Sequence, residues 1–260
     1  MKKKKQIPQK NISKKTGIKT NYSVSRRDYT GLSLILLITF IVYRVSLSNG
    51  FVNWDDDKYI QNNPLITFID LKALFSTYVM GNYHPLTMLG YAIEYQFFGL
   101  NATGYHVINL LLHLVNVLLV FYTVFYLSNK TIVALIASLL FGIHPMHVES
   151  VAWVTERKDV LYGLFFIAGL ISYTKYTDTG SRKQYIITLI FPILALLSKP
   201  AAVVFPLVLF CIDLLRKRKL AVKLLVEKIS FFILPLILGF ITFLAQKEKG
   251  PVRLPPVGAK

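Results

Sequence analysis

Three consecutive carboxylates, Asp55, Asp56 and Asp57, come soon after a long apolar segment of the chain. Charge is costly near a bilayer, so acids at the mouth of a membrane helix usually mark a site for a cation, a proton or a polar substrate. Because adjacent like charges repel, at least one of these groups should accept a proton more readily than an isolated acid, as a general base must. A solvated acidic cap at the end of a helix is the alternative.

A second group of candidate residues contains His144, His147 and Glu149. These residue types bind metals, but Pro145 disrupts the helical spacing that a His-x-x-His pair needs. The charged run 156–159 follows, with Arg157 and Lys158 at its centre. It is either a solvated turn or a place where these cations engage a phosphate while Glu149 orients a hydroxyl.

A polar stripe marks one apolar segment, with residues spaced by three, four and three positions. Such a stripe faces the interior of a helix bundle, where it either makes interhelical hydrogen bonds or lines a substrate pocket. Two further candidates, His84 and Lys199, each precede a proline, and Lys199 either extends toward the membrane surface or contacts a phosphate. The stripe consists of His106, Asn109, His113 and Asn116.

Composition requires that these residues be positioned by membrane helices. The chain has 260 residues, of which 54% are hydrophobic, and the mean hydropathy is +0.50. These values exclude an ordinary soluble domain. We therefore predict an all-α polytopic membrane protein with about seven spans in residues 29–245. The predicted spans are 29–48, 104–127, 131–143 with a possible extension to 153, 160–174, 185–198, 200–215 and 229–245.

Charge distribution predicts the orientation. Residues 1–27 contain ten Lys and Arg and no acid, which favours a basic, disordered cytoplasmic tail over residues 1–28 that contacts anionic lipids. Without aromatic residues in a folded patch, nucleic-acid binding is disfavoured. The first outer loop, 50–103, has five acids and two bases, and 246–260 forms an outer tail that ends as in a truncated protein. The loop should itself be folded, with one amphipathic helix over 71–79 capped by Asp70 and another over 86–97 ending at Gly99.

Several blocks together resemble one known family. They are Phe51-Val52 with Asp55-Asp56, then His84-Pro85-Leu86-Thr87, Gly99-Leu100-Asn101, and Gly104 through His113. The run from His144 through Val154, the run from Arg157 through Leu161, and Leu197-Ser198-Lys199-Pro200 complete the set. This set, from about residue 49 to 215, resembles the transmembrane-and-tetratricopeptide-repeat (TMTC) family of O-mannosyltransferases in the GT-C glycosyltransferase superfamily.

The resemblance implies a GT-C-like helical bundle that moves a sugar from a polyprenyl-phosphate carrier to a protein hydroxyl at the extracytoplasmic face. Asp55 or Asp56 would be the base, in a cell membrane if the protein is bacterial and in the endoplasmic reticulum if it is eukaryotic. Family members carry further spans and a repeat domain that this chain lacks, and His84 stands where Arg is expected in animal members. No metal or other cofactor is expected, with a divalent cation at Asp55 and Asp56 as the alternative. The site that binds the sugar and the lipid phosphate is expected to include His84, His106, His144, His147, Glu149, Arg157, Lys158 and Lys199.

Two other functions remain open. An ion-coupled transporter would use the acids to bind an ion, but we find no internal repeat between the halves of the chain of the kind common in transporters. A non-catalytic, lipid-binding membrane scaffold is the third possibility. The single cysteine, Cys211, excludes a disulfide framework within the chain.

Overall fold

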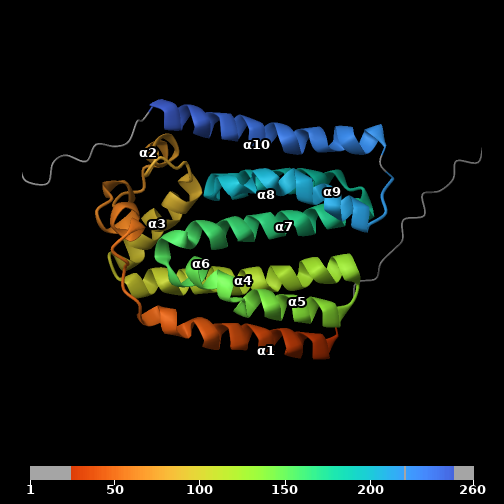
Figure 1. Ribbon diagram of the computed structural model, residues 1–260, viewed down its shortest axis with the longest axis horizontal. Coiled ribbons are helices and arrows are strands. Elements are labelled where there is room, and N and C mark those ends of the chain that lie inside the picture. The colour runs from red at the N-terminus through yellow and green to blue at the C-terminus, as the bar shows by residue number, and fades with distance from the viewer. Residues whose placement is uncertain (1–24, 220, 249–260) are drawn as a thin grey trace, which may run out of the picture.

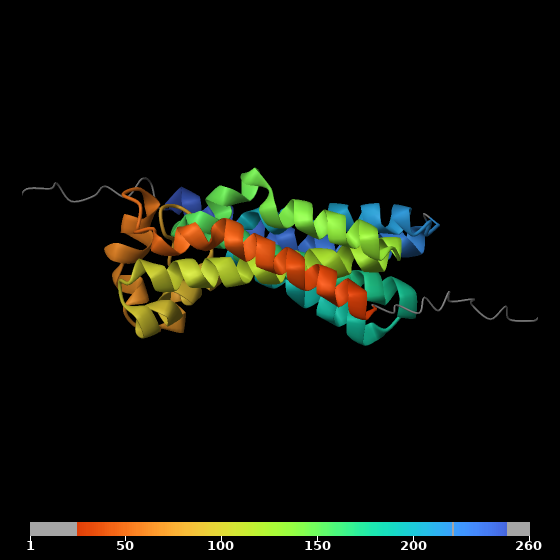
Figure 2. The same cartoon turned by 90° about the horizontal axis from the view of Figure 1, so that it is seen from below.

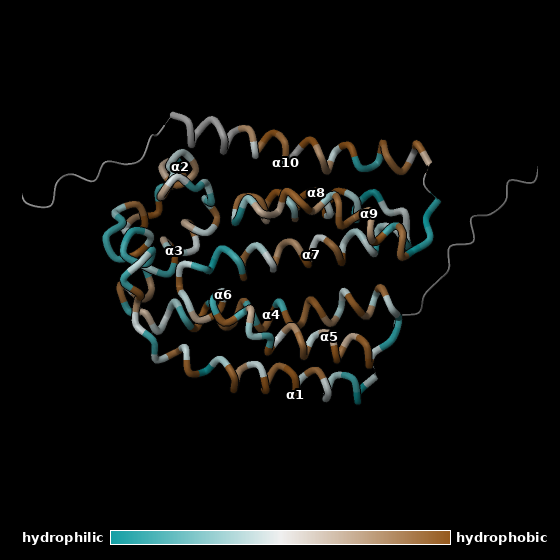
Figure 3. Tube along the Cα trace, viewed as in Figure 1, coloured by the Kyte–Doolittle hydropathy of each residue, from teal (hydrophilic) through white to brown (hydrophobic). Residues whose placement is uncertain are grey.

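The computed structural model describes residues 25–219 and 221–248, and these residues fold into helices without a named strand. The long helices run side by side in an elongated bundle, and the outer-loop segment gathers at one end of it (Figure 1). Hydropathy follows this arrangement, because apolar residues cover the middle of the helices and polar residues concentrate at the two ends (Figure 3). The prediction of an all-helical membrane protein is therefore confirmed. Most of the predicted basic tail, residues 1–24, lies outside the described residues, as does the predicted outer tail from 249 onward.

Within residues 25–219 and 221–248, two helices are long and apolar enough to cross a membrane. They are α1 (Arg26–Tyr43), extended by a 3₁₀ turn to Ser48, and α4 (Ala102–Ser128). Helix α1 begins with a capping box, in which the Ser25 backbone N–H donates to Asp28 (2.8 Å) and the Asp28 N–H donates to the Ser25 hydroxyl (3.3 Å).

A third crossing is formed if two helices count as one span. Helix α5 (Thr131–Ile143) and the segment Pro145–Ala152, which contains α6 (Val148–Ala152), meet at a bend of 50°. Pro145 explains the bend, since proline lacks the N–H that would continue the helix. This bend stands out from the bundle in the second view (Figure 2). About seven spans therefore remains a prediction, because two or three helices among the described residues meet both criteria.

The second half of the bundle consists of α7 (Arg157–Thr179), α8 (Arg182–Ser198), α9 (Phe205–Leu215) and α10 (Val222–Glu248). A 3₁₀ turn, Pro200–Val204, separates α8 from α9. The predicted break at Lys199 and Pro200 is thus confirmed, because the residue before a proline is displaced from helical geometry. Lys199 has φ −155° and ψ 132°.

The segment predicted as the outer loop, residues 50–103, contains a π-helical turn (Asp57–Gln61), a 3₁₀ turn (Pro64–Ile66), α2 (Leu71–Ser76) and α3 (Pro85–Phe98). One hydrophobic cluster connects this segment to the bundle. In it, Leu74 and Tyr91 pack with Tyr105 of α4 and with Val154. Two expectations from the sequence are confirmed: the Asp70 side chain accepts from the N–H of Ala73 (3.1 Å), and α3 ends at Gly99.

The predicted helix over 71–79 is too long. Helix α2 stops at Ser76, and Thr77 is extended. Val79 and Asn82 then exchange backbone hydrogen bonds of 3.1 and 2.9 Å around a turn. Met80 and Gly81 both have positive φ, at 50° and 76°, so this turn, which the apolar spacing does not encode, ends the helix.

Candidate active site at the loop end of the bundle

Asp56 connects the outer loop to the segment that precedes α7. Its side chain is fully buried. One carboxylate oxygen accepts from the Trp153 indole N–H (3.0 Å) and the Thr155 backbone N–H (3.1 Å), and the other accepts from the Val52 N–H (2.8 Å). Three donors therefore fix the position of this carboxylate in a site without solvent. Two segments nearly 100 residues apart in the chain are thereby held together.

Asp55 has different surroundings. It is half-buried, and no hydrogen bond or ion pair joins its carboxylate to another residue in the described part of the chain. It lies near Tyr59: burial raises the pKa of Tyr59 to about 12, and the negative charges of Asp55 and Glu156 act in the same direction. Lys158 Nζ lies 5.7 Å from the centre of the Tyr59 ring. Tyr59 therefore links the Asp55 region to the charged turn before α7.

That turn carries two carboxylates, Glu156 and Asp159, and meets two lysines. Lys158 Nζ lies 2.8 Å from a Glu156 oxygen, and Lys199 Nζ lies 3.9 Å from the other. Lys199 also pairs with Asp159. Burial raises the pKa of Glu156, which the two lysines counteract. Lys158 and Lys199 keep part of their surface exposed, at 18% and 31%, so both can reach an anionic ligand.

His84 lies beside the same group of side chains. It is buried, its ring centre is 5.2 Å from that of Tyr59, and its Nε2 has no hydrogen-bond partner among the described residues. Burial lowers the pKa of His84 to about 4, and the charge of Lys158 contributes in the same direction. The imidazole is therefore neutral near pH 7.

Arg157 is occupied by partners within the protein. Its side chain is 2% exposed, pairs with Glu94 of α3, and also donates to the Asn109 side chain. A further bond of 2.8 Å reaches the Tyr105 carbonyl, and the Tyr91 ring centre is 5.5 Å from the guanidinium carbon. Burial raises the pKa of Glu94, which Arg157 opposes. The predicted phosphate contact would require these bonds to break.

The polar stripe on α4 faces the bundle interior, as predicted. All four side chains are buried, and three of them bond to backbone carbonyls of other segments. The ring nitrogens of His106 have no hydrogen-bond partner among the described residues. The bonds run from Asn109 to Trp153 (3.0 Å), between His113 and Gly142 (3.0 Å), and from Asn116 to Val160 (2.8 Å).

The group formed by His144, His147 and Glu149 lies at the bend between α5 and α6. His144 and Glu149 are exposed, and the Nδ1 of His144 accepts from the Met146 N–H (3.2 Å). The His147 ring centre lies 4.4 Å from that of Phe141. Within the described ranges no three His, Cys, Asp or Glu side chains are grouped to hold a metal ion, and no hydrogen bond there joins these three to Asp55 or Asp56.

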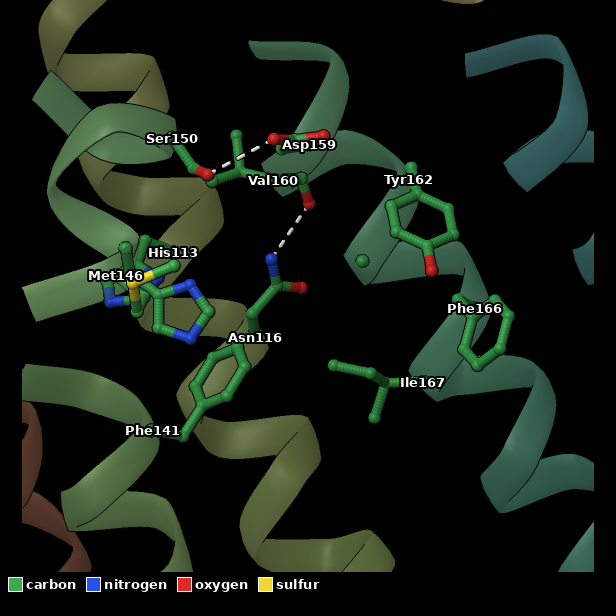
Figure 4. A pocket seen from close by; sticks show the side chains of 12 residues that line it. His113, Asn116, Phe141, Met146, Ser150, Asp159, Val160, Tyr162, Phe166 and Ile167 are labelled. Carbon is green, nitrogen blue, oxygen red and sulfur yellow. Dashed lines mark hydrogen bonds between the residues drawn. The ribbon is translucent and has the colours of Figure 1, made fainter. Parts of the chain in front are cut away.

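A pocket of about 430 Å³ lies between α4, the α5–α6 bend and the first turns of α7. Figure 4 shows Asp159 and Ser150 at one side of it and Phe141, Phe166 and Ile167 at the other. Asp159 accepts from the Ser150 hydroxyl (3.2 Å). Because Asp159 also pairs with Lys199, the pocket adjoins the charged turn.

Sequence reasoning missed a buried charge network at the opposite end of the bundle. Asp213 and Lys228 are both buried and lie 2.8 Å apart, and Tyr173 donates to Asp213 (2.7 Å). Arg218 completes the network by bridging Asp213 (2.8 Å) and Glu227 (3.0 Å). A signal was available, since an acid and a lysine inside otherwise apolar runs need partners in a membrane.

Comparison with known proteins finds relatives that are all named protein O-mannosyl-transferases. The chain is 34% identical over 155 residues to the human protein O-mannosyl-transferase TMTC3, which covers 55% of this chain and 17% of that protein. It is 30% identical over 206 residues to the Caenorhabditis elegans protein O-mannosyl-transferase F38B6.6 (72% and 28%). It is 32% identical over 197 residues to mouse TMTC1 (67% and 20%). Over the matched residues the chain is of TMTC type.

The match confirms the resemblance drawn from the motif blocks. This TMTC-type chain spans between 17% and 28% of the length of these three relatives. No family model matches it, and no solved structure does.

Proposed function

We propose that this TMTC-type chain belongs to a membrane glycosyltransferase that moves a sugar, mannose by the names of its relatives, from a polyprenyl-phosphate carrier to a protein hydroxyl. One observation carries the proposal. The buried Asp56 holds the outer-loop acids against the turn that carries Lys158 (Trp153 3.0 Å, Thr155 3.1 Å). A base and fixed cations at one end of a membrane bundle are what transfer from a lipid phosphate requires.

The residues take separate roles in this proposal. The acceptor oxygen attacks the anomeric carbon of the sugar, the bond from that carbon to the phosphate oxygen breaks, and Asp55 takes the hydroxyl proton. Lys158 and Lys199 hold the departing phosphate, whose charge they compensate without a metal ion. Asp56 and Arg157 are positioning residues, because each is saturated by protein partners.

The proposed orientation is the one that the charges favour. The basic N-terminal segment and the loop between α7 and α8 lie on the cytoplasmic side, and residues 50–103 lie outside, with α1, α4, the α5–α6 pair and α7 to α10 giving seven crossings. The N-terminal end of α1 and the α7–α8 loop occupy the same end of the bundle, opposite the outer loop (Figure 1). This arrangement supports the proposal, as does the acidic excess of the outer loop.

A transfer assay tests the proposed chemistry. Membranes that contain the chain receive radiolabelled polyprenyl-phosphate mannose, and label in protein is counted. We expect Asp55→Asn to lower transfer by about 100-fold or more, the usual contribution of a general base. Asp57→Asn is the matched control, and its transfer should stay within about twofold of that of the unaltered chain, since the neighbouring acid is given no role in the reaction.

Two outcomes reject the proposal. Full transfer by Asp55→Asn would remove the base assignment, and full transfer by Asp56→Asn as well would remove the positioning role of Asp56. Absence of transfer by the unaltered chain, together with an ion flux across the same membranes that Asp55→Asn abolishes, would favour the transporter.

A further inference from the structure

The pocket beside the α5–α6 bend has the size and lining of a ligand site, and this holds whether or not the proposed reaction takes place. It measures about 430 Å³, within the range of small-ligand sites. Its wall is mostly apolar and aromatic, and it is closed on one side by α4 and α7. On the other side the wall is formed by a broken helix, not by a continuous span. Irregular backbone at membrane depth is tolerated where it lines such a cavity.

Two polar atoms face the centre of this pocket. The Asn116 side chain is 2% exposed; its N–H donates to Val160, while its oxygen has no hydrogen-bond partner among the described residues. Figure 4 shows this oxygen and the Tyr162 hydroxyl directed into the space bounded by Phe166 and Ile167. A buried acceptor without a donor is costly, so a ligand atom that donates to it would be stabilised there.

The charges in the pocket select the kind of ligand. Among the lining residues of the described chain none is Lys or Arg, and Asp159 is the one carboxylate. Lys199 pairs with Asp159 from outside the lining, so an anionic phosphate in the pocket would lie beside this carboxylate and find no unpaired cation on the described part of the wall. A neutral hydroxyl, in contrast, can donate to Asn116 and accept from Tyr162.

The apolar lining selects the remainder of the ligand. Phe141, Met146, Phe166 and Ile167 supply a surface on which a hydrocarbon body loses its contact with water or lipid head groups. The sulfur of Met146 adapts to irregular shapes. We propose that this pocket binds a neutral lipid alcohol, with its hydroxyl between Asn116 and Tyr162 and its hydrocarbon body along the aromatic wall.

Photolabelling of the full chain in lipid nanodiscs tests this proposal. The probe is a long-chain isoprenoid alcohol that carries a diazirine, and labelled peptides are mapped. We expect label on α4 and α7 near residues 116 and 162–167, competed by geranylgeraniol at lower concentration than by geranylgeranyl phosphate or free mannose. Label elsewhere, or equal competition by the phosphate or by mannose, would overturn the proposal.

Variants locate the contacts. Tyr162→Phe removes one hydroxyl, and we expect the concentration of geranylgeraniol for half-competition to rise about five- to tenfold, the equivalent of one hydrogen bond. Ile167→Trp fills the cavity and should abolish labelling. Tyr176→Phe is the matched control on the same helix at the opposite end and should change nothing. Thermal unfolding of each variant confirms that it folds, and a folded Ile167→Trp that labels normally would reject the pocket as the site.

Discussion

The neighbouring carboxylates Asp55 and Asp56 differ in burial, and this difference suits them to different roles. Asp56 is fully enclosed and accepts three hydrogen bonds, whereas Asp55 is half-buried and free to meet a proton donor. Three fixed donors hold the Asp56 carboxylate in one orientation. Because the Asp56 carboxylate would lose these hydrogen bonds if it moved, it is better suited to holding the two segments together than to transferring a proton.

Stability measurements separate the two roles. Asp56→Asn replaces one acceptor oxygen with an amide that faces donors, so we expect the free energy of unfolding to fall by about 2–4 kcal/mol. Asp55→Asn should change it by less than about 0.5 kcal/mol. Denaturant titration in detergent, followed by tryptophan fluorescence, measures both. Equal losses for the two variants would mean that Asp55 is also a structural residue.

His84 makes stability depend on pH. Its pKa in the folded chain is about 4, below the ordinary value of 6.5, so the unfolded chain binds the proton more tightly. The stabilisation is fully present above about pH 6.5 and is lost as the pH falls toward 4, by up to about 3 kcal/mol. His84→Gln should therefore flatten the fall of the melting temperature between about pH 6.5 and 4.5, measured by differential scanning fluorimetry. An unchanged slope would show that His84 is solvated or paired.

At the scale of helices, one buried ion pair fixes the position of α3 against α7. Arg157 pairs with Glu94 and also bonds to α4 through Asn109 and Tyr105. The desolvation cost of each buried charge is offset only while its oppositely charged partner is present. The first turn of α7, which carries Lys158 and Asp159, therefore depends on a residue of the outer loop.

A double-variant cycle tests this dependence. Arg157→Met leaves the Glu94 carboxylate buried and unpaired, and we expect a loss of about 3–5 kcal/mol in the free energy of unfolding. Adding Glu94→Gln should restore a large part of it, since no buried charge then remains. Urea titrations of the two single variants and the double variant give the coupling energy. Additive losses would show that the two side chains do not act as a pair.

The ends of a helix were predictable where a local feature of the sequence, such as an apolar run, a proline or a glycine, determines them. Apolar runs located α1 and α4, Pro200 located the break after α8, and Gly99 located the end of α3. The end of α2 was not predictable in the same way, because the turn at Met80 and Gly81 has no proline and the apolar spacing continues to Val79. Local periodicity records which residues can be buried, whereas the backbone turn that interrupts it depends on contacts with the rest of the loop.

The candidate site was predictable by region and less so by role. Asp56 of the predicted outer loop bonds to Thr155, directly before the charged turn, and both segments were predicted to lie on one side of the membrane. Arg157, which was predicted to hold a phosphate, pairs with Glu94 in the core. Residue type and spacing give no information on which of two neighbouring cations, Arg157 or Lys158, points into the core, because that choice depends on α3, which comes from about 60 residues earlier in the chain.

At the scale of the whole molecule, hydrophilic residues concentrate at the two ends of the bundle, and mostly apolar helix segments lie between them (Figure 3). One end joins the outer loop to α7. The other holds the buried network of Asp213, Lys228 and Arg218. Since Asp56 bonds to Trp153, residues 56 and 153 share one end, and the α5–α6 pair must then return the chain from the other end.

Labelling with a membrane-impermeant maleimide tests this path. In a Cys211→Ser background, Asn53→Cys and Lys183→Cys each place one thiol at an exposed position, the first in the outer loop and the second in the first turn of α8. If α1, α4, the α5–α6 pair and α7 each cross once, position 53 reacts in intact cells and position 183 reacts only after permeabilisation. Reaction of both thiols in intact cells would mean that the α5–α6 pair enters and leaves on the same side. The Asp56–Trp153 bond would then be impossible, because a polar side chain and its donor cannot meet across the hydrocarbon core.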